Sequence, residues 1–453
     1  MSLDLPHQVF AHERYAVVGL GRNGGPVAAA LVARGAAVAV WDDRPEARAA
    51  AGLPLHDPAQ GLAGFTALVL SPGIPADHPA GLAARQAGIP ILSDAELLFQ
   101  ATRRRGGGVR FVGITGTNGK STTTALLHHM LQQAGVDSAA GGNLGTPALA
   151  LPELGGGGVY VLEMSSYMLE RLTTLRFDAS ALLNLSPDHL DRHGSMAGYI
   201  AAKRHVFDRQ EPGDIAVIGI DDPDTADIAA SLHGPRVTTI SGHQPAAVWC
   251  RGGLLCDRDG PILPMVEAPA LPGTHNAQNA AAAAALAASL GLDQAAIAAG
   301  IAGFAGLPHR QQRVAVVDGV AWINDSKATN ADAAARALAC YDRIVWIAGG
   351  QAKAGGIAPL APLFPRIAHA LLIGRDAPAL AATLAAAGVP HSTPGTLEAA
   401  VPAARALAAP LHADVVLLSP ACASFDQFAG FEARGERFRD LVLGDAPALR
   451  RTA

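Results

Sequence analysis

The sequence predicts an α/β protein with several mainly parallel sheets, and three observations support this prediction. Short runs of β-branched and aliphatic residues alternate with helical patterns through most of the 453 residues, an order typical of βαβ units. Glycine-rich or polar turns follow most of these runs. Two turn-rich stretches, at 103–108 and 307–310, divide the chain. Its length alone allows two to four domains, at roughly 100–200 residues each.

Composition limits the classes of function. The net charge is −5, so no basic field predicts binding to nucleic acid or to an anionic membrane. The four cysteines include no Cys-x-x-Cys pair and are too few for a disulfide framework, which suits a reducing compartment. We find no signal peptide pattern, and the alanine-rich segment 280–288 is flanked by polar groups. We therefore expect a cytoplasmic protein without a membrane span.

The first predicted strand, 15–18, leads into a glycine turn at 19–24 and then a helical pattern. A second strand, 36–41, places Asp42 and Asp43 about twenty residues after the glycines. This is the spacing of a dinucleotide-binding fingerprint, in which a carboxylate binds a ribose. From this segment alone, NAD(P), another nucleotide and no ligand at all remain open alternatives.

Strands at 67–70 and 89–92 continue this first part of the chain. The strand at 67–70 is followed by Ser71 in a proline- and glycine-containing loop. Loops at the carboxyl ends of parallel strands are where α/β proteins bind ligands, so Ser71 is a candidate binding residue.

A phosphate-binding loop is predicted between residues 109 and 124. A β-branched strand leads into a glycine turn, and a helical pattern follows Lys120 and Ser121. In such a loop the backbone N–H groups and the lysine bind phosphates, and the hydroxyl binds Mg²⁺. The strict pattern has glycine where this chain has Ile114, so an ordinary glycine-rich turn is the alternative. The candidate contacts are Gly116, Thr117, Asn118, Gly119, Lys120, Ser121 and Thr122.

Later segments supply candidate metal ligands. The strand at 159–162 ends on Glu163, a position suited to holding Mg²⁺. The strand at 179–185 opens into a charged turn that contains His189. A single histidine would more often be structural, but in this cluster a metal or phosphate role is favoured. Lys203 lies on a helical pattern, and the sequence alone favours a solvated helix lysine.

An alanine-rich helix beginning near residue 273 carries Asn276 and Asn279 on one face. Their amides suit hydrogen bonding to a base or a ribose, although helix capping is the simple alternative for Asn276. Residues 236–266 predict short β-segments of a peripheral sheet.

The last third of the chain predicts another parallel sheet whose loops converge on one edge. Its expected strands are 314–317, 321–324, 344–348, 370–373 and 415–418. The loops after them contain Lys327, Thr329, Lys353 and Ser424. Together these side chains suit a small acidic molecule, although each alone is equally consistent with a solvated surface residue.

The order of these motifs resembles the Mur ligase family of amide ligases over nearly the whole chain. The matching segments are 115–121, 162–166, 188–192, 275–276, 308–310, 325–330 and 419–428. The last of them, with Phe431 and Gly435 after it, looks specific to the branch that adds D-glutamate. The resemblance implies three domains: a Rossmann-like domain for a uridine nucleotide (1–98), a central P-loop-type ATPase domain (99–306) and a Rossmann-like amino-acid-binding domain (307–453).

The resemblance also implies ATP, two Mg²⁺ ions, UDP-N-acetylmuramoyl-L-alanine and D-glutamate as the ligands of a monomer. Lys120, His189 and Lys203 would be catalytic, with Lys203 as its carbamate. Ser121, Glu163, His189 and Lys203 would hold Mg²⁺. Asn276, Asn279, Arg310 and Asp325 would contact ATP. The substrate contacts would be Asp42, Asp43, Ser71, Asn143, Ser165, Lys327, Thr329, Lys353, Ser424 and Phe431. The glycine loop before Lys353 differs from the commoner form in the family.

The implied reaction converts the L-alanyl carboxylate to an acyl phosphate, which the amine of D-glutamate attacks through a tetrahedral intermediate. A folylpolyglutamate-type ligase, an NAD(P)-dependent oxidoreductase built on residues 15–43 and a non-catalytic nucleotide-binding regulator are the alternatives. The complete N-terminal unit disfavours the first of these. An oxidoreductase would leave Lys120 and Glu163 without a role.

Overall fold

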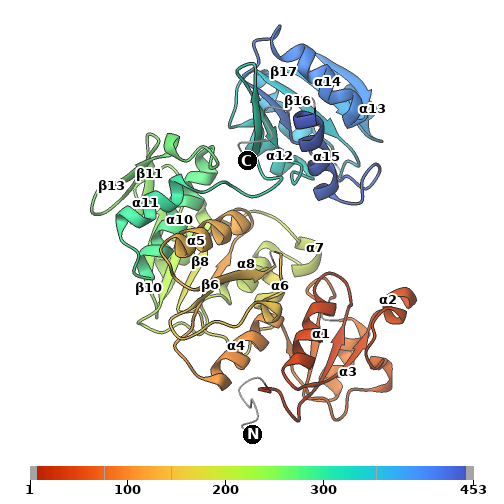
Figure 1. The fold of residues 1–453 in the computed structure, drawn as a ribbon, viewed down its shortest axis with the longest axis vertical. Coiled ribbons are helices and arrows are strands. Elements are labelled where there is room, and N and C mark those ends of the chain that lie inside the picture. The colour runs from red at the N-terminus through yellow and green to blue at the C-terminus, as the bar shows by residue number, and fades with distance from the viewer. Residues whose placement is uncertain (1–7, 76, 144, 354, 445–453) are drawn as a thin grey trace. The chain divides into compact units, whose positions relative to one another are not determined.

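The computed structural model describes residues 8–75, 77–143, 145–353 and 355–444. It confirms the predicted α/β class with three separate sheets of four, nine and six strands (Figure 1). The chain divides into two compact units, Met1–Glu267 with Asn276–Gly303, and Ala268–His275 with Phe304–Ala453. The first unit contains the four- and nine-stranded sheets, and the second contains the six-stranded sheet.

The N-terminal sheet has the order β2-β1-β3-β4, and all its pairs are parallel. Its elements are β1 (Arg14–Val18), α1 (Gly24–Ala33), β2 (Ala37–Trp41), α2 (Pro45–Ala49), β3 (Ala67–Leu70), α3 (Pro79–Gln86), β4 (Ile91–Leu92) and α4 (Asp94–Arg105). Ser93 caps α4 by accepting a hydrogen bond from the Glu96 amide, and three arginines occupy its last turn. These features favour one continuous helix, and α4 runs without a break through the expected division after residue 98.

The central sheet has the order β13-β12-β11-β10-β9-β8-β5-β7-β6. Its elements are β5 (Arg110–Thr115), α5 (Lys120–Gln133), β6 (Ser138–Gly142), β7 (Val159–Glu163), α6 (Ser166–Leu169), β8 (Ala179–Leu182), α7 (Leu190–His193), α8 (Met196–Arg204), β9 (Ile215–Gly219), α9 (Pro223–Ser231), β10 (Arg236–Ser241), β11 (Val248–Arg251), β12 (Leu254–Asp257), β13 (Pro261–Pro264), α10 (Thr274–Ser289) and α11 (Gln294–Ala302). The peripheral β-segments predicted for 236–266 are confirmed as β10 to β13. Strand β6 was not predicted, because its Ser-Ala-Ala-Gly-Gly sequence lacks β-branched residues and depends on its pairing with β7.

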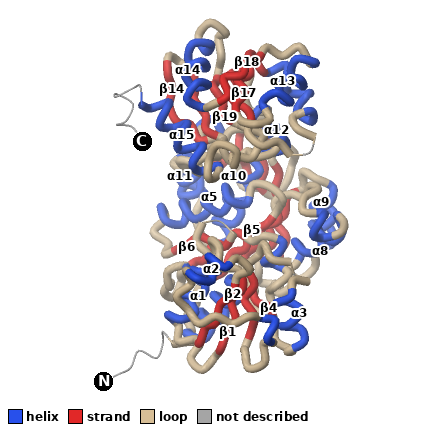
Figure 2. The backbone as a smooth tube through the Cα atoms, turned by 90° about the vertical axis from the view of Figure 1, so that its right-hand side faces the viewer, coloured by secondary structure: helices blue, strands red, loops and turns tan. Residues whose placement is uncertain are grey.

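The C-terminal sheet has the order β14-β15-β19-β16-β17-β18. Its elements are β14 (Gln312–Val317), β15 (Val320–Asn324), α12 (Ala331–Leu338), β16 (Ile344–Gly349), β17 (Ile367–Ile373), α13 (Ala377–Ala386), β18 (His391–Gly395), α14 (Leu397–Ala408), β19 (Val415–Leu418) and α15 (Phe431–Gly444). Helices cover both faces (Figure 2), with α12 and α13 on one and α14 and α15 on the other. Alternate residues of the buried strands supply the two cores.

The expectation of a wholly parallel C-terminal sheet is wrong at one edge. Strands β14 and β15 pair in antiparallel register and are joined by Asp318 and Gly319. Both residues have positive φ, 51° and 81°, as the central residues of a tight hairpin turn require. A two-residue connection can join only antiparallel strands, because a parallel crossover needs a much longer one.

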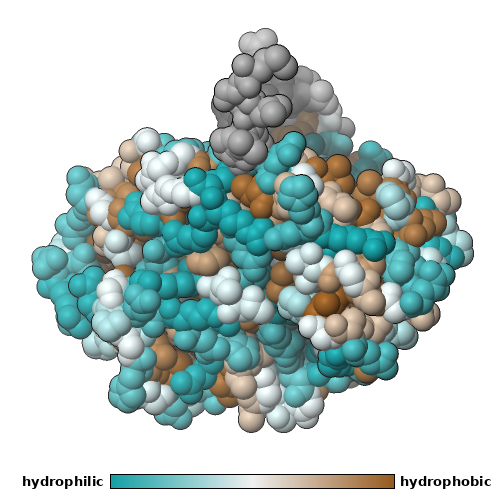
Figure 3. Space-filling model, turned by 90° about the horizontal axis from the view of Figure 1, so that it is seen from below, coloured by the Kyte–Doolittle hydropathy of each residue, from teal (hydrophilic) through white to brown (hydrophobic). Residues whose placement is uncertain are grey.

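No helix in the described part of the chain has the length and apolar character needed to cross a membrane. The face drawn in Figure 3 is largely hydrophilic, with hydrophobic residues in small separate groups. All four cysteines are free thiols, which confirms that they do not form a disulfide framework.

Candidate functional site

The predicted phosphate loop lies between β5 and α5, as the sequence indicated. Ile114 is fully buried inside β5, and the strand continues to Thr115, so the turn begins only at Gly116. This explains why the glycine of the strict pattern is displaced. Gly116 and Gly119 have φ of 148° and 86°, and a side chain at Gly119 would overlap the Oδ1 atom of Asn279. The loop therefore requires glycine at 119 for both conformation and space.

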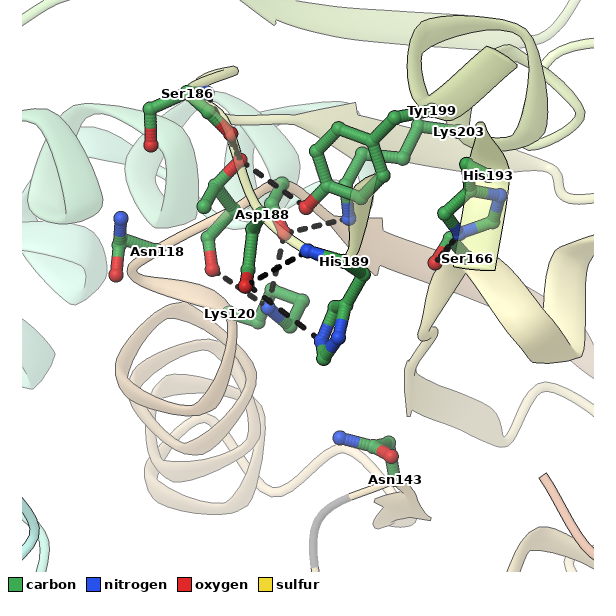
Figure 4. A network of polar contacts seen from close by, with 12 residues as sticks. Asn118, Lys120, Asn143, Ser166, Ser186, Asp188, His189, His193, Tyr199 and Lys203 are labelled. Atoms are coloured by element: carbon green, nitrogen blue, oxygen red, sulfur yellow. Dashed lines mark hydrogen bonds and ion pairs between the residues drawn. The ribbon is translucent and has the colours of Figure 1, made fainter. Parts of the chain in front are cut away.

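Two lysines converge on this loop (Figure 4). Lys120 Nζ donates to the carbonyl oxygens of Gly116 and Thr117, each at 2.9 Å. Lys203 Nζ donates to the same Gly116 oxygen at 2.8 Å and lies 3.4 Å from Thr115 Oγ1. Lys203 is only 2% exposed, so its interpretation as a solvated helix lysine is wrong. Burial, reinforced by the charge of Lys120, lowers the pKa of Lys203 well below its usual value.

Glu163 lies at the end of β7 with its side chain buried. Its Oε1 atom accepts a hydrogen bond from Asn143 Nδ2 at 2.7 Å. Its Oε2 atom is buried and has no hydrogen-bond partner among the described residues. A buried carboxylate oxygen without a partner is costly, and a bound cation would satisfy it. Ser165, two residues later, accepts from the Met168 amide and caps α6.

His189 begins α7 from a left-handed conformation with φ of 52°. Its imidazole is half exposed, and its Nε2 atom lies 3.6 Å from Asp188 Oδ2. No set of three histidine, cysteine, aspartate or glutamate side chains in the described residues forms a ready-made metal cluster. Such an incomplete protein shell is usual for Mg²⁺, which keeps water and substrate oxygens as ligands.

Tyr199 and His193 also lie near the loop; sequence reasoning placed His193 in the charged turn after residues 179–185 but missed Tyr199. Tyr199 OH lies 3.2 Å from Thr117 Oγ1, and its ring lies 4.8 Å from Lys203 Nζ. Burial raises the pKa of Tyr199 to about 12. His193, one turn after His189, is hydrogen-bonded to Ser166 at 3.0 Å. The spacing of Tyr199 and Lys203, four residues apart on one helix face, was the available signal for the first of them.

Asn276 and Asn279 are both buried in α10, three residues apart on one helix face as predicted. Asn276 is not a helix cap, because the helix begins before it and its Oδ1 atom accepts from Asn279 Nδ2 at 3.0 Å. Asn279 Oδ1 also lies 3.4 Å from Thr123 Oγ1 and packs against Gly119. The two amides therefore brace the start of α5.

The N-terminal glycine turn forms a pocket with four predicted substrate contacts: Asp42, Asp43, Ser71 and Asn143. Asp42 is buried, and its carboxylate already accepts from the Leu20 amide at 2.7 Å and from Arg44 Nε at 3.0 Å. Hydrogen bonding to Arg44 lowers the pKa of Asp42 to about 2. Asp43 is exposed and lies 3.1 Å from His78 Nε2. Asp43 is thus more available to a ligand than Asp42.

In the second unit, Asp325 follows β15 and is almost fully buried. Its carboxylate accepts from Ser419 Oγ at 2.8 Å and from the Gln311 amide at 3.2 Å. Burial raises the pKa of Asp325 to about 7. Arg310 precedes Gln311 in the same turn, before β14.

The loops that carry the predicted amino-acid contacts are tied together by backbone and arginine hydrogen bonds. Gln351 and Ala423 exchange backbone hydrogen bonds at 2.8 and 2.9 Å. Buried Arg434, which sequence reasoning missed, donates to the carbonyl oxygens of Ser326 at 2.9 Å and Cys422 at 3.1 Å.

The predicted amino-acid contacts differ in exposure. Lys327 Nζ lies 4.1 Å from the centre of the Phe431 ring, which brings these two predicted contacts together. Lys353 is exposed and Ser424 is buried. The backbone amide of Thr329 donates a hydrogen bond to the carbonyl oxygen of Lys327 at 2.8 Å.

The fold and the site define a nucleotide-binding α/β protein with a phosphate loop. Three family models match the chain: a MurD-like N-terminal domain of Mur ligases at 13–93, the Mur ligase middle domain at 114–287 and the Mur ligase glutamate ligase domain at 309–422. The chain belongs to the Mur ligase family.

Similar proteins cover almost the whole chain. The UDP-N-acetylmuramoylalanine–D-glutamate ligase of Paramagnetospirillum magneticum is 52% identical, over 95% of this chain and 96% of that protein. The enzyme of the same name from Caulobacter vibrioides is 47% identical, over 97% and 98%. Among solved structures, the UDP-N-acetylmuramate–alanine ligase of Thermotoga maritima has a TM-score of 0.60 at 19% identity, over 96% of this chain and 100% of that chain. This structural likeness supports the fold.

Proposed function

We propose that this chain is an ATP-dependent ligase that joins D-glutamate to UDP-N-acetylmuramoyl-L-alanine and releases ADP and phosphate, as a step of peptidoglycan precursor synthesis. The observation that carries the proposal is the convergence of Lys120 and Lys203 on the Gly116 carbonyl beside the buried Glu163. The relatives with 52% and 47% identity carry this function in their names.

The phosphate loop binds ATP through the backbone amides at the start of α5 and through Lys120. The ammonium group of Lys120 offsets charge that develops on the transferred phosphoryl group. The γ-phosphoryl group passes to an oxygen of the L-alanyl carboxylate, and ADP leaves. The amine of D-glutamate then attacks the acyl phosphate, and phosphate leaves as the tetrahedral intermediate collapses.

Mg²⁺ fits the residues beside the loop, because Glu163 presents an orphaned buried oxygen. We propose one ion held by Ser121 and Glu163, and a second by His189 and Lys203. Bound Mg²⁺ would neutralise phosphate charge. Lys203 binds as a carbamate, formed when its neutral amine adds CO₂ and loses one proton. The lowered pKa of Lys203 supports this step, since only an unprotonated amine is nucleophilic.

The remaining candidates bind substrates in this proposal. Asn276, Asn279, Arg310 and Asp325 serve ATP. Asp42, Asp43, Ser71, Asn143 and Ser165 serve the sugar nucleotide, and Lys327, Thr329, Lys353, Ser424 and Phe431 serve D-glutamate. We further propose domain boundaries after residues 98 and 306, a monomeric state and a cytoplasmic location. The limits of the three matched family models support the division into three domains.

A phosphate-release assay tests the proposal. The purified chain is incubated with ATP, Mg²⁺ and UDP-N-acetylmuramoyl-L-alanine, and D-glutamate, L-glutamate, L-lysine or diaminopimelate is added. We expect release with D-glutamate alone, and its loss in the Lys120→Ala variant. Absence of release with D-glutamate, or equal release with another amino acid, would contradict the assignment.

A further inference from the structure

His193 joins two short helices that directly follow the proposed metal ligands. Helix α6 begins three residues after Glu163, and helix α7 begins directly after His189. The His193 side chain, at the end of α7, is 2% exposed. Figure 4 shows it directed at Ser166, at the start of α6. The His193 imidazole therefore links the segment that follows Glu163 to the segment that follows His189.

The contacts of His193 use both ring nitrogens. Nε2 lies 3.0 Å from Ser166 Oγ, and Nδ1 lies 3.3 Å from Glu170 Oε1. The Glu170 carboxylate has no proton to donate, so Nδ1 must carry the hydrogen and donate it to Glu170. In the neutral ring Nε2 then has no hydrogen, and it accepts from the Ser166 hydroxyl. Burial lowers the pKa of His193, which favours this neutral form. One proton arrangement therefore satisfies the whole Glu170–His193–Ser166 chain.

Aromatic contacts extend this link to His189. The His193 ring stacks on Tyr167 at 5.6 Å with an interplanar angle of 20°. Tyr167 also contacts the His189 ring at 5.3 Å, and the Arg192 guanidinium lies 4.8 Å from the Tyr167 ring. His189 itself is half exposed on a left-handed residue. The orientation of the His189 side chain therefore depends on how the surrounding loop is anchored.

We propose that His193 is a positioning residue that holds the His189 loop in register with the strand end bearing Glu163. It acts through Ser166, Glu170 and Tyr167, so that the two sides of the divalent-cation site form together. This inference rests on the proposed function, because it assigns His189 and Glu163 to that site. Partners outside the ligand shell orient ligands, and their loss typically weakens metal binding ~10–100-fold.

The test uses the full chain and Mn²⁺ as a spectroscopic probe. His193→Phe keeps a stacking ring and removes both nitrogens, and His233→Phe makes the same change at an exposed histidine. We measure the Mn²⁺ dissociation constant by electron paramagnetic resonance with a non-hydrolysable ATP analogue present. We expect the Mn²⁺ dissociation constant to rise about tenfold or more in His193→Phe. In His233→Phe it should change by less than about twofold.

A second pair of variants covers the case in which His193→Phe does not fold. Glu170→Gln keeps an oxygen facing Nδ1, whereas Glu170→Ala removes it. We expect weaker Mn²⁺ binding in Glu170→Ala and near-normal binding in Glu170→Gln. The KM for D-glutamate should stay within about twofold, while kcat falls with Mn²⁺ affinity.

Unchanged Mn²⁺ affinity in folded His193→Phe, or in Glu170→Ala, would overturn the proposal. Failure of the ligase assay with intact chain is a separate result. It would remove the proposed function, whereas the Mn²⁺ titration measures the cation site directly.

Discussion

Two glycine turns in the first unit share one backbone plan and differ in charge. Each follows a parallel strand and opens a helix, at Gly19 after β1 and at Gly116 after β5. The carbonyl oxygen of Gly19 accepts from the Ser71 hydroxyl at 2.7 Å, whereas that of Gly116 accepts from two lysines. Glycine spacing thus predicts a turn and its conformation, and the side chains around the turn decide which ligand it takes.

One backbone amide of the N-terminal turn is already hydrogen-bonded within the protein. The Leu20 N–H group points at Asp42 and cannot bind a phosphate at the same time. The lining of the N-terminal pocket carries two aspartates, Asp42 and Asp43, and two arginines, Arg22 and Arg44.

The largest effect is expected from removing Lys203, one of the two lysines that distinguish the central turn. Lys203→Ala should lower kcat about 10²–10³-fold, the range seen when a group that stabilises transition-state charge is lost. Added acetate should restore part of the activity if a carbamate is the missing group. Steady-state phosphate release measures both effects.

Arg204→Ala is the matched control for this experiment, because Arg204 is the exposed neighbour on the same helix. The Arg204→Ala variant should keep its activity, and added acetate should not change that activity. Full activity in Lys203→Ala would remove Lys203 from the site and reduce the difference between the two turns to Lys120 alone.

The two turns also show which strands can be located from the local sequence pattern and which cannot. The strands around both turns consist mainly of β-branched and aliphatic residues, and local pattern was sufficient to locate β1, β3 and β19 within a residue. Strand β18, with the polar sequence His-Ser-Thr-Pro-Gly, was missed because it exists only through its pairing with β17. Local propensity carries no information about such a partner.

The site divides in the same way. The phosphate loop and Glu163 follow directly from a strand and its turn, so their neighbourhood is local in sequence. Lys203, Tyr199 and Arg434 owe their roles to burial against segments far along the chain, and composition alone marks them as ordinary helix residues. Only the family resemblance placed Lys203 in the candidate site.

A second prediction tests whether the N-terminal turn depends on glycine as strictly as the central one. A Cβ atom at Gly24 would overlap the carbonyl oxygen of Gly19. Gly24→Ala should therefore destabilise the N-terminal sheet by about 2–3 kcal/mol, as overpacking and backbone displacement commonly do. Hydrogen exchange of the β1 and β2 amides measures the local free energy of opening.

Gly25→Ala supplies the control, because its new Cβ would lie 3.9 Å from the nearest atom, the Leu20 oxygen, and Gly25 lies inside α1. Alanine exceeds glycine in helix propensity by up to ~1 kcal/mol, so this variant should be neutral or slightly more stable. Equal stability of the two variants would show that the turn can rearrange.

The smallest effect concerns the carboxylate that occupies the N-terminal turn. Hydrogen bonding to Arg44 lowers the pKa of Asp42 to about 2, from 3.8 in the unfolded chain. A depressed pKa means that the unfolded state binds the proton first. The carboxylate therefore stabilises the native turn above pH 4, and this contribution disappears as the pH falls from about 4 to about 2.

Asp42→Asn keeps an oxygen for the Leu20 amide but removes the charge that pairs with Arg44. Between pH 4 and 2 the β1 and β2 amides of the wild type should lose protection more steeply than those of the variant, with a difference smaller than that caused by Gly24→Ala. Above pH 5 the two proteins should differ by a constant amount. If their profiles are parallel down to pH 2, the pKa of Asp42 is the same in the folded and unfolded chain. Arg44 then does not hold the carboxylate, which would be available to a ligand after all.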